Sequence, residues 1–325
     1  MTILVTGGAG YIGSHMVLEL RDRGEQVLVL DNLSTGRRAA VPSDVPLVIG
    51  DVGDFESVLR LLRDHRVRSI IHFAARIIVP ESVADPLGYY LENTMKTRAL
   101  IAAAVAADVR EFIFSSTAAV YGDAPPRPLD ETEPTNPLSP YGSSKLMSEW
   151  ILRDTARAHG LRYAILRYFN VAGADPAGRA GQSNPNATHL IKVALQAALG
   201  ERPHMEVFGQ DYPTPDGTGV RDYIHVSDLA SAHAAVLDKL RDRSENLLVN
   251  AGYGRGYSVR DVIRSVKSVT GVDFEVRQNP RRPGDPPSVV ADSSLLRRDV
   301  GWEPRHDDLD TIIRHAYDWE RRRPY

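Results

Sequence analysis

The sequence predicts an α/β fold built on a doubly wound parallel sheet, followed by a smaller second lobe. Short β-branched runs alternate with helical patterns in the first half of the chain, and they cover residues 3–6, 26–31, 46–51, 69–75, 111–116 and 163–168. Strand, helix and strand in this order produce a parallel sheet with helices on both faces. After about residue 170 the pattern becomes irregular. We therefore expect a first domain over residues 1–170 and a second over 171–325, with some segments of the second returning to the sheet.

The composition excludes several classes of protein. The chain has 325 residues, 25% of them charged, and a formal net charge of -3, so it has no broad basic field to attract nucleic acid or an anionic membrane. It contains no cysteine, which excludes disulfides and zinc sites that use sulfur. The sequence shows no signal-like leader and no run of 18 apolar residues, so we expect a cytoplasmic protein without membrane spans.

Three glycines separate the first strand-like run from the first helical pattern. In TGGAGYIG, Gly7, Gly10 and Gly13 precede and enter a helix that is predicted to start near Tyr11. Positions without Cβ allow the backbone amides and the positive end of the helix to approach a pyrophosphate. Taken alone, the triplet also fits an ordinary turn between a strand and a helix.

An acidic residue at the end of the second strand supports the nucleotide interpretation. Asp31 follows Gly13 by 18 residues, close to the spacing of a carboxylate that binds the adenosine ribose hydroxyls. Such a carboxylate repels a 2′-phosphate and favours NAD over NADP, although Arg37 and Arg38 lie nearby. For Asp51, after the third strand, an adenine contact and a simple turn role are both open.

A tyrosine and a lysine lie four residues apart in YGSSK. On a helix Tyr141 and Lys145 share one face. The pKa of free tyrosine is about 10, so it is a poor base at neutral pH unless positive charge stabilises the phenolate. The lysine ammonium and an oxidised nicotinamide ring would together lower this pKa. Thr117 ends the preceding strand, where its hydroxyl can pass a proton between a substrate oxygen and Tyr141.

Together these motifs resemble the extended short-chain dehydrogenases/reductases and, within them, the UDP-glucose 4-epimerases. The resemblance covers nearly the whole chain, in ILVTGGAGYIGSH, DNLSTG, IHFAA, ESVADPL, YYLENT, LRYFNVAGADP, THLI, VFGQDYPTPDGTGVRDYIHV, NAGYGRGYSV and RRPGDPP. It implies a Rossmann-type sheet with a smaller C-terminal substrate-binding lobe, NAD as the cofactor and a UDP-sugar as the substrate. The implied reaction is 4-epimerisation of UDP-glucose and UDP-galactose through a 4-keto intermediate, with the corresponding N-acetylhexosamines as further candidates.

The resemblance also implies a role for each matching position. Tyr141 is the base, Lys145 its partner and Thr117 the hydroxyl that shares the proton. The implied cofactor-binding residues are Gly7, Gly10, Tyr11, Ile12, Gly13, Asp31, Asn32, Asp51, Val52, Phe73, Ala74, Ala75, Asn93, Ser115, Tyr141, Lys145 and Tyr168. The implied substrate-binding residues are Thr117, Tyr141, Asn170, His189, Leu190, Phe208, Arg221, Tyr223, Arg282, Asp285 and Val289. Arg221 and Arg282 match a diphosphate clamp, a role suited to guanidinium because it holds phosphate oxygens through parallel hydrogen bonds.

Two positions depart from the pattern of the family. Ile77 stands where some members have a lysine that helps to hold NAD, which leaves the tightness of cofactor retention open. Val289 stands where a bulky aromatic residue bounds the sugar pocket of strict glucose/galactose enzymes, and valine predicts room for N-acetylated sugars. A plain role for Val289 in a buried strand is the alternative.

Several rival functions share this fold. Nucleotide-sugar 4,6-dehydratases need an Asp-Glu pair after the threonine, where this chain has Ala118 and Ala119. UDP-xylose/UDP-arabinose and UDP-glucuronate 4-epimerases stay open, and so does the pathway, whether galactose use or polysaccharide supply. A non-catalytic NAD-binding regulator would be expected to lack Tyr141 or Lys145. We expect no metal site, because His72 and His225 fit core positions in strands and no H-E-x-x-H pattern occurs.

The resemblance further implies a homodimer. Members of the family pack helices of the first domain into a four-helix bundle, and the helical patterns over residues 85–107 and 141–159 match these helices. Between the two predicted halves of the site, residues 124–140 contain six prolines, which excludes a helix interior or a central strand. We expect this segment to be an ordered loop over a site or a surface excursion.

Overall fold

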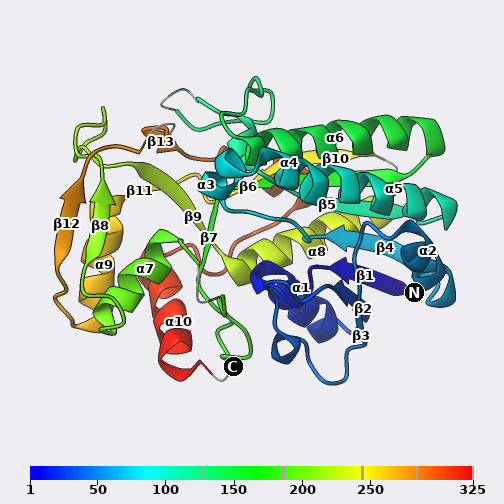
Figure 1. The fold of residues 1–325 in the computed structure, drawn as a ribbon, viewed down its shortest axis with the longest axis horizontal. Helices are drawn as coiled ribbons and strands as arrows, with labels where there is room; N and C mark the ends of the chain where they lie inside the picture. The colour runs from blue at the N-terminus through cyan, green and yellow to red at the C-terminus, as the bar shows by residue number, and fades with distance from the viewer. Residues whose placement is uncertain (124, 126, 185–186, 243–244, 283–284, 324–325) are drawn as a thin grey trace.

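A seven-stranded parallel sheet forms the centre of the chain (Figure 1). The computed structural model describes residues 1–123, 125, 127–184, 187–242, 245–282 and 285–323. The strand order in the sheet is β10-β6-β5-β4-β1-β2-β3, and all neighbours are parallel. These strands are β1 (Thr2–Thr6), β2 (Gln26–Asp31), β3 (Leu47–Ile49), β4 (Val67–His72), β5 (Glu111–Thr117), β6 (Arg162–Tyr168) and β10 (Leu247–Ala251). The predicted Rossmann-type fold class is confirmed.

Helices cover both faces of this sheet because successive strand residues point in opposite directions. In β1, Ile3 and Val5 belong to one buried cluster and Leu4 to another. The first cluster includes residues of α1 (Tyr11–Asp22) and α8 (Val226–Asp242). The second lies on the opposite face and includes residues of α2 (Phe55–Asp64), α5 (Lys96–Ala106) and α6 (Pro140–His159). In Figure 1 α5 and α6 run along the top of the view, whereas α1 and α8 lie at its centre, beside β1.

The later part of the chain adds two small sheets and a third core cluster. One small sheet has the order β11-β9-β13, with β7 also paired to β9, and the other pairs β12 with β8. Their strands are β7 (Asn170–Ala172), β8 (Met205–Phe208), β9 (Val220–His225), β11 (Gly256–Ser258), β12 (Val276–Asn279) and β13 (Ser288–Val289). The third cluster packs them against α7 (Leu190–Ala198), α9 (Val259–Thr270) and α10 (Leu309–Arg322).

The helix predicted over residues 85–107 contains a π-helical segment. It consists of α4 (Pro86–Tyr89), η2 (Tyr90–Met95) and α5. The buried Asn93 lies in the π-helical part, where its side chain bonds both the N–H and the carbonyl of Arg76. π-helical turns inside helices are rare and occur frequently at functional sites. The other short elements are α3 (Val79–Ala84), η1 (Arg38–Ala40), η3 (Ala118–Val120) and η4 (Leu296–Val300).

The proline-rich segment between η3 and α6 is a loop that forms hydrogen bonds with a segment near the end of the chain. Leu129 N donates to Val290 O, and Asp292 N donates to Leu129 O, so the loop pairs with the segment that follows β13. Residues 124 and 126 lie outside the described part. At its end the Ser139 hydroxyl accepts from Gly142 N (3.2 Å) and caps α6. The chain therefore enters the helix of Tyr141 at a defined residue.

The topology determines where a ligand can bind. From β1 the chain proceeds to β2 and β3 on one side, and then crosses to β4 on the other side of β1. In open parallel sheets, ligands bind beyond the carboxyl ends of the strands at such a switch point. Thr6, Asp31, His72, Thr117 and Tyr168 are the last residues of β1, β2, β4, β5 and β6.

None of the described helices combines the length and the apolar character that a membrane span requires.

Candidate active site

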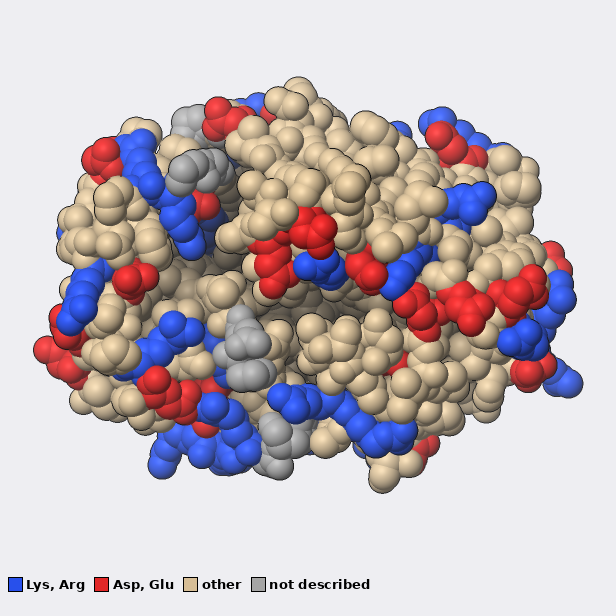
Figure 2. Space-filling view, viewed as in Figure 1, with Lys and Arg blue, Asp and Glu red and all other residues tan. Residues whose placement is uncertain are grey.

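A cavity of about 360 Å³ lies at the carboxyl ends of the central strands. Figure 2 shows this face of the molecule hollowed between the sheet-bearing half and the smaller lobe. The predicted residues that line the cavity are Gly7, Gly10, Tyr11, Ile12, Gly13, Asp31, Asn32, Asp51, Val52, Phe73, Ala74, Ala75, Thr117, Tyr141, Tyr168, Asn170 and His189. The fold thus brings together the residues of four separate sequence motifs.

The glycine turn is too tight for side chains at two positions. Gly7 has a φ of +69°, and a Cβ there would lie 2.7 Å from Ala74 N. A Cβ on Gly13 would lie 2.1 Å from Gly7 O. The backbone of the turn and the first turn of α1 therefore border the cavity directly, which is the arrangement that binds a pyrophosphate.

Asp31 connects this turn to the end of the second strand. Its carboxylate accepts hydrogen bonds from Ala9 N (2.9 Å) and Leu33 N (2.8 Å) while the residue lines the cavity. The side chain is 7% exposed, so the amide bonds offset the cost of burying its charge. A carboxylate held in this way keeps acceptor capacity for hydroxyl donors in the cavity.

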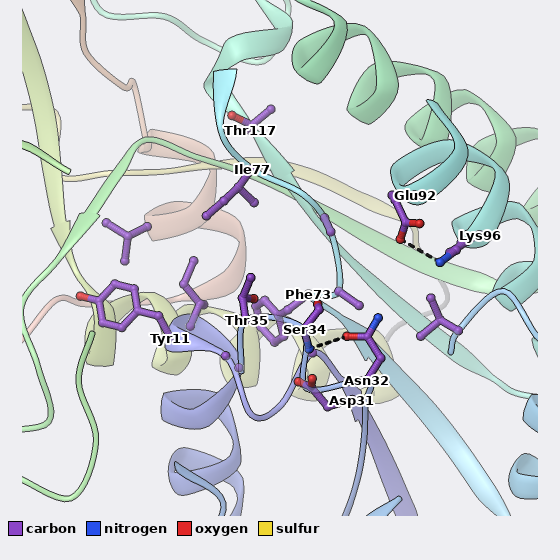
Figure 3. Close-up of a pocket in the computed structure, with 18 of the residues that line it drawn as sticks. Tyr11, Asp31, Asn32, Ser34, Thr35, Phe73, Ile77, Glu92, Lys96 and Thr117 are labelled. Carbon is purple, nitrogen blue, oxygen red and sulfur yellow. Dashed lines mark hydrogen bonds and ion pairs between the residues drawn. The ribbon is translucent and has the colours of Figure 1, made fainter. Parts of the chain in front are cut away.

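One end of the cavity carries a cation between two carboxylates. Lys96 Nζ lies 2.6 Å from Asp51 Oδ2 and 2.8 Å from Glu92 Oε2. In Figure 3 Glu92 and Lys96 lie at the opposite end of the cavity from Tyr11, and Thr117 lies apart from both. Ile77 is 48% exposed on the cavity wall and supplies no charge there.

Tyr141 and Thr117 meet at the wall of the cavity. Tyr141 lies in the first turn of α6 and is 6% exposed, and Thr117 ends β5. Burial raises the pKa of Tyr141, and hydrogen bonding by Thr117 acts in the opposite direction. Within the chain the burial of the phenol has the larger effect, so the lowered pKa that the sequence predicts requires more positive charge beside the phenol than the Thr117 hydrogen bond offsets.

Lys145 lies one helical turn beyond Tyr141 and behind the cavity wall. Its Nζ donates to Ser115 O (2.9 Å) and lies 4.9 Å from the centre of the Phe114 ring. Burial lowers the pKa of Lys145 to about 7, against the opposite effect of the Glu149 carboxylate. The lysine is therefore close to its titration range at neutral pH.

A second cavity of about 550 Å³ adjoins the first, since Asn170 and His189 line both. Its wall contains the Arg282–Asp285 ion pair (2.9 Å), and the Arg282 guanidinium lies 4.7 Å from the centre of the Phe208 ring. The predicted residues that line this cavity are Asn170, His189, Leu190, Phe208, Arg221, Tyr223, Arg282 and Asp285. Two guanidinium groups beside an aromatic ring form a surface suited to a nucleoside diphosphate.

Four predicted residues lie behind the cavity walls: Asn93, Ser115, Lys145 and Val289. The Asn93 side chain holds the turn that follows Ala75, and the Ser115 carbonyl holds Lys145. Val289 pairs in register with Arg221 and packs against the cluster around Leu129 and Phe169.

The two histidines expected in the core are buried there. His72 bonds Thr6 Oγ1 (2.6 Å) and Thr97 Oγ1 (2.8 Å), and His225 Nε2 lies 3.0 Å from His315 Nδ1. In the described part of the chain no group of three or more His, Cys, Asp or Glu side chains is arranged to hold a metal ion.

Comparison with known proteins identifies the family. The model of the NAD dependent epimerase/dehydratase family matches residues 3–252. The chain belongs to this family. It is 56% identical to the UDP-glucose 4-epimerase of Azospirillum brasilense over 98% of this chain and 92% of that protein. The crystal structure of UDP-glucose 4-epimerase from Brucella ovis in complex with NAD is 44% identical, with a TM-score of 0.95 over 98% of this chain and 97% of that one. The enzyme from Bifidobacterium longum in complex with NAD+ and UDP is 37% identical, with a TM-score of 0.94 over 100% and 99%.

Some residues line the two cavities of this epimerase/dehydratase family member but were not predicted from the sequence. They include Ser34, Thr35, Glu92, Lys96, Phe169, Gln182 and Arg202. The spacing of Glu92 and Lys96 indicates an ion pair on a helix. Their approach to Asp51 depends on how α5 packs on the sheet, which no local pattern reveals.

Glu149 provides a test of the charge on Lys145. Its carboxylate is buried, accepts from Ser116 Oγ (2.5 Å) and pairs with Arg167 (2.6 Å). Because this charge raises the pKa of Lys145, Glu149→Gln should lower that pKa, and the ammonium should lose its proton at lower pH. We expect the alkaline limb of kcat/KM to move to lower pH.

The control is Glu111→Gln, at another buried glutamate that pairs with Arg162 at the far end of the sheet. It should leave the limb in place. An alkaline limb that stays fixed or moves to higher pH in Glu149→Gln would contradict the role of the Glu149 charge.

Proposed function

We propose that this protein catalyses the NAD-dependent 4-epimerisation of UDP-sugars. The observation that carries the proposal is that Thr117 and Tyr141 line a cavity that shares Asn170 and His189 with the guanidinium-bearing one. We assign NAD to the first cavity, mainly within residues 1–170, and the UDP group to the second, mainly within residues 171–325.

The first cavity fits a dinucleotide. Side chains are excluded at Gly7 and Gly13, so the backbone and the start of α1 can approach a diphosphate, and Asp31 lines the same cavity at the end of β2, where a ribose carboxylate partner is expected. NAD bound there would accept and return the hydride at C4 of the sugar.

The chain supplies the proton transfer. Tyr141 would take the proton from the sugar O4 when the 4-keto sugar forms and return it when the alcohol is restored. Thr117 would share this proton through its hydrogen bond with the phenol. The Lys145 ammonium, fixed by Ser115 O, would favour the phenolate by its charge.

Inversion at C4 requires the sugar to present both of its faces to the same hydride position. Arg221 and Arg282 would hold the diphosphate through charge-assisted hydrogen bonds, which are the strong contacts of the complex. The sugar would then turn about its bond to the diphosphate between the two halves of the reaction. In this way the nucleotide stays bound while the ketone changes face.

The rival functions are less well supported. Ala118 and Ala119 follow Thr117 in η3, and neither side chain can transfer a proton at C5 or C6 as a dehydratase requires. A non-catalytic regulator has no need of a buried Tyr141 and Lys145 beside a hydride site. UDP-xylose/UDP-arabinose or UDP-glucuronate as substrates are outcomes of the test below.

We propose that Val289 leaves room for N-acetylated sugars, because it is a small residue that packs against the cluster of Phe169, which lines the first cavity. The purified protein, without added NAD, should convert both UDP-galactose and UDP-N-acetylgalactosamine to their 4-epimers, as followed by NMR. Val289→Tyr should retain the first conversion and lose most of the second.

The outcomes separate the parts of the proposal. Conversion of UDP-galactose alone would show that the wider pocket is wrong. Conversion that needs added NAD would show that the cofactor dissociates readily, as Ile77 suggests. If neither sugar reacts with NAD present, epimerisation of these hexoses is wrong, and pentose and uronate substrates come next.

We also propose a homodimer formed through α4, η2, α5 and α6. Five large apolar side chains are exposed on these helices: Leu87, Leu91, Met95, Met147 and Trp150. Such a set of exposed apolar residues is typical of an interface. Trp150, 51% exposed, is the natural anchor because buried tryptophans dominate interface energies. Cytoplasmic location stays a prediction from the sequence.

Trp150→Glu should weaken the dimer by roughly 30-fold or more, the effect of losing a hot-spot side chain. Light scattering over a range of concentrations measures this change. Val272→Glu places the same charge at an exposed apolar residue after α9 and should leave the mass unchanged. A monomeric wild type would contradict the proposal.

A further inference from the structure

A loop over residues 173–182 borders the first cavity and is attached to α1. The Arg179 guanidinium bonds Asp175 in the loop and Asp22 at the end of α1, with N–O distances of 2.8 Å in both pairs. At the start of the loop the Tyr11 hydroxyl donates to Gly173 O (2.7 Å). The first part of the loop is therefore tied to the helix that begins at the glycine turn.

The last part of the loop rests on the C-terminal helix. Trp319, 2% exposed, packs so closely on Gly181 that a Cβ there would lie 2.3 Å from the indole Cγ. The indole N–H of Trp319 also donates to Gln182 O (3.3 Å). Since no side chain fits at position 181, α10 determines where the backbone of residues 181 and 182 runs.

A buried ion pair contacts the carbonyl of Gln182 from a second direction. Lys192 Nζ lies 2.5 Å from Glu320 Oε1, and the two side chains are 5% and 2% exposed. The ammonium also donates to Gln182 O (3.3 Å). Burial raises the pKa of Glu320, and the cations of Lys192 and Arg323 oppose this shift. The pair therefore joins α7, α10 and the loop.

The residue held by these contacts lines the cavity near the glycine turn. Gln182 lines the first cavity together with Tyr11 and His189, whose rings meet edge-on at 6.5 Å. Tyr11 is the first residue of α1, where the backbone turns toward the cavity. The Gln182 amide carries N–H donors, which a diphosphate accepts.

We propose that Gln182 is a further binding residue for the diphosphate of the bound dinucleotide. Trp319 and the Lys192–Glu320 pair are positioning residues that act through it. The inference rests on the proposed use of NAD. The C-terminal helix, far from the nucleotide motifs in the sequence, thus contributes to cofactor retention.

The test is a double-mutant cycle on the rate of NAD dissociation, measured in the absence of any sugar. Gln182→Ala and Glu320→Gln should each speed NAD release roughly tenfold, the effect of losing one charge-assisted hydrogen bond. The double variant should be no faster than Gln182→Ala, because Glu320 acts through Gln182. Asp318→Asn makes the same acid-to-amide change on an exposed residue of α10 and should not alter release.

Trp319→Phe provides a second variant if Glu320→Gln does not fold, since it keeps an aromatic ring beside Gly181 while it loses the N–H donor and part of the indole surface. It should also speed NAD release. The inference is wrong if Gln182→Ala leaves NAD release unchanged, or if the effects of the two single variants multiply in the double variant. Because no sugar is present, a protein that retains NAD but epimerises nothing would refute the proposed reaction and leave this inference standing.

Discussion

Replacing Tyr141 by phenylalanine should lower kcat for UDP-galactose by about 10³-fold, within the range that general acid–base catalysis contributes. The phenylalanine keeps the buried ring beside Thr117 and removes only the group that exchanges the O4 proton. KM should change little, since the diphosphate clamp lies in the other cavity. NMR of the two epimers at saturating substrate measures the rate, and NAD should remain bound in the variant.

Tyr121→Phe is the matched control for this experiment. Tyr121 is also buried, and its hydroxyl bonds Asn250 Oδ1 (2.7 Å) away from both cavities. Its loss should cost stability of about 1 kcal/mol and leave kcat within a few-fold. If Tyr141→Phe kept more than a tenth of the wild-type kcat, another group would have to be the base.

Replacing Arg221 by alanine should raise KM for UDP-sugars by roughly 10- to 150-fold, the equivalent of one charge-assisted hydrogen bond of about 1.5–3 kcal/mol. Arg221 lies on β9, where its guanidinium donates to Val220 O (2.8 Å) and faces the second cavity. Retention of NAD should be unaffected, because the first cavity does not include this residue.

Arg221→Lys should recover only part of the loss, since an ammonium keeps the charge but cannot make two parallel hydrogen bonds to phosphate. Arg277→Ala is the control. It removes an exposed arginine of β12 that pairs with Glu275, and it should leave KM unchanged. An Arg221→Ala variant with normal KM and lower kcat would show that the clamp lies elsewhere. Titration of UDP by calorimetry measures the same contact without turnover.

The glycine turn and Asp31 show why much of the fold and the cofactor site is readable from the sequence. Alternation of strands and helices dictates a parallel sheet, and a parallel sheet brings the carboxyl ends of its strands to one edge. Residues that follow strands in the sequence, such as Asp51 and Phe73, are therefore neighbours in space. The spacing of Tyr141 and Lys145 is likewise a local property of one helix.

Lys96 and Gln182 show what the sequence does not reveal. Lys96 and Asp51 are 45 positions apart in the sequence, yet their side chains are in contact. They meet because α5 packs against the second core cluster. The contact of Val289 with the cluster around Phe169, which places Val289 behind the wall of the first cavity, also depends on strand pairing in the small sheet. No short-range pattern encodes these distances.

The sugar chemistry was implied by the resemblance to the UDP-glucose 4-epimerases. The sequence by itself determined the class of fold, the nucleotide turn, and the spacing that puts Tyr141 and Lys145 on one face of a helix. These follow from backbone geometry and local spacing, which act over a few residues. Only the tertiary structure decided that the two cavities join at Asn170 and His189, that Lys145 is buried near its titration range, and that α10 holds Gln182. Those features arise from packing between segments far apart in the chain. In such packing, side-chain shape determines the distances between groups, and burial determines how readily a side chain carries charge.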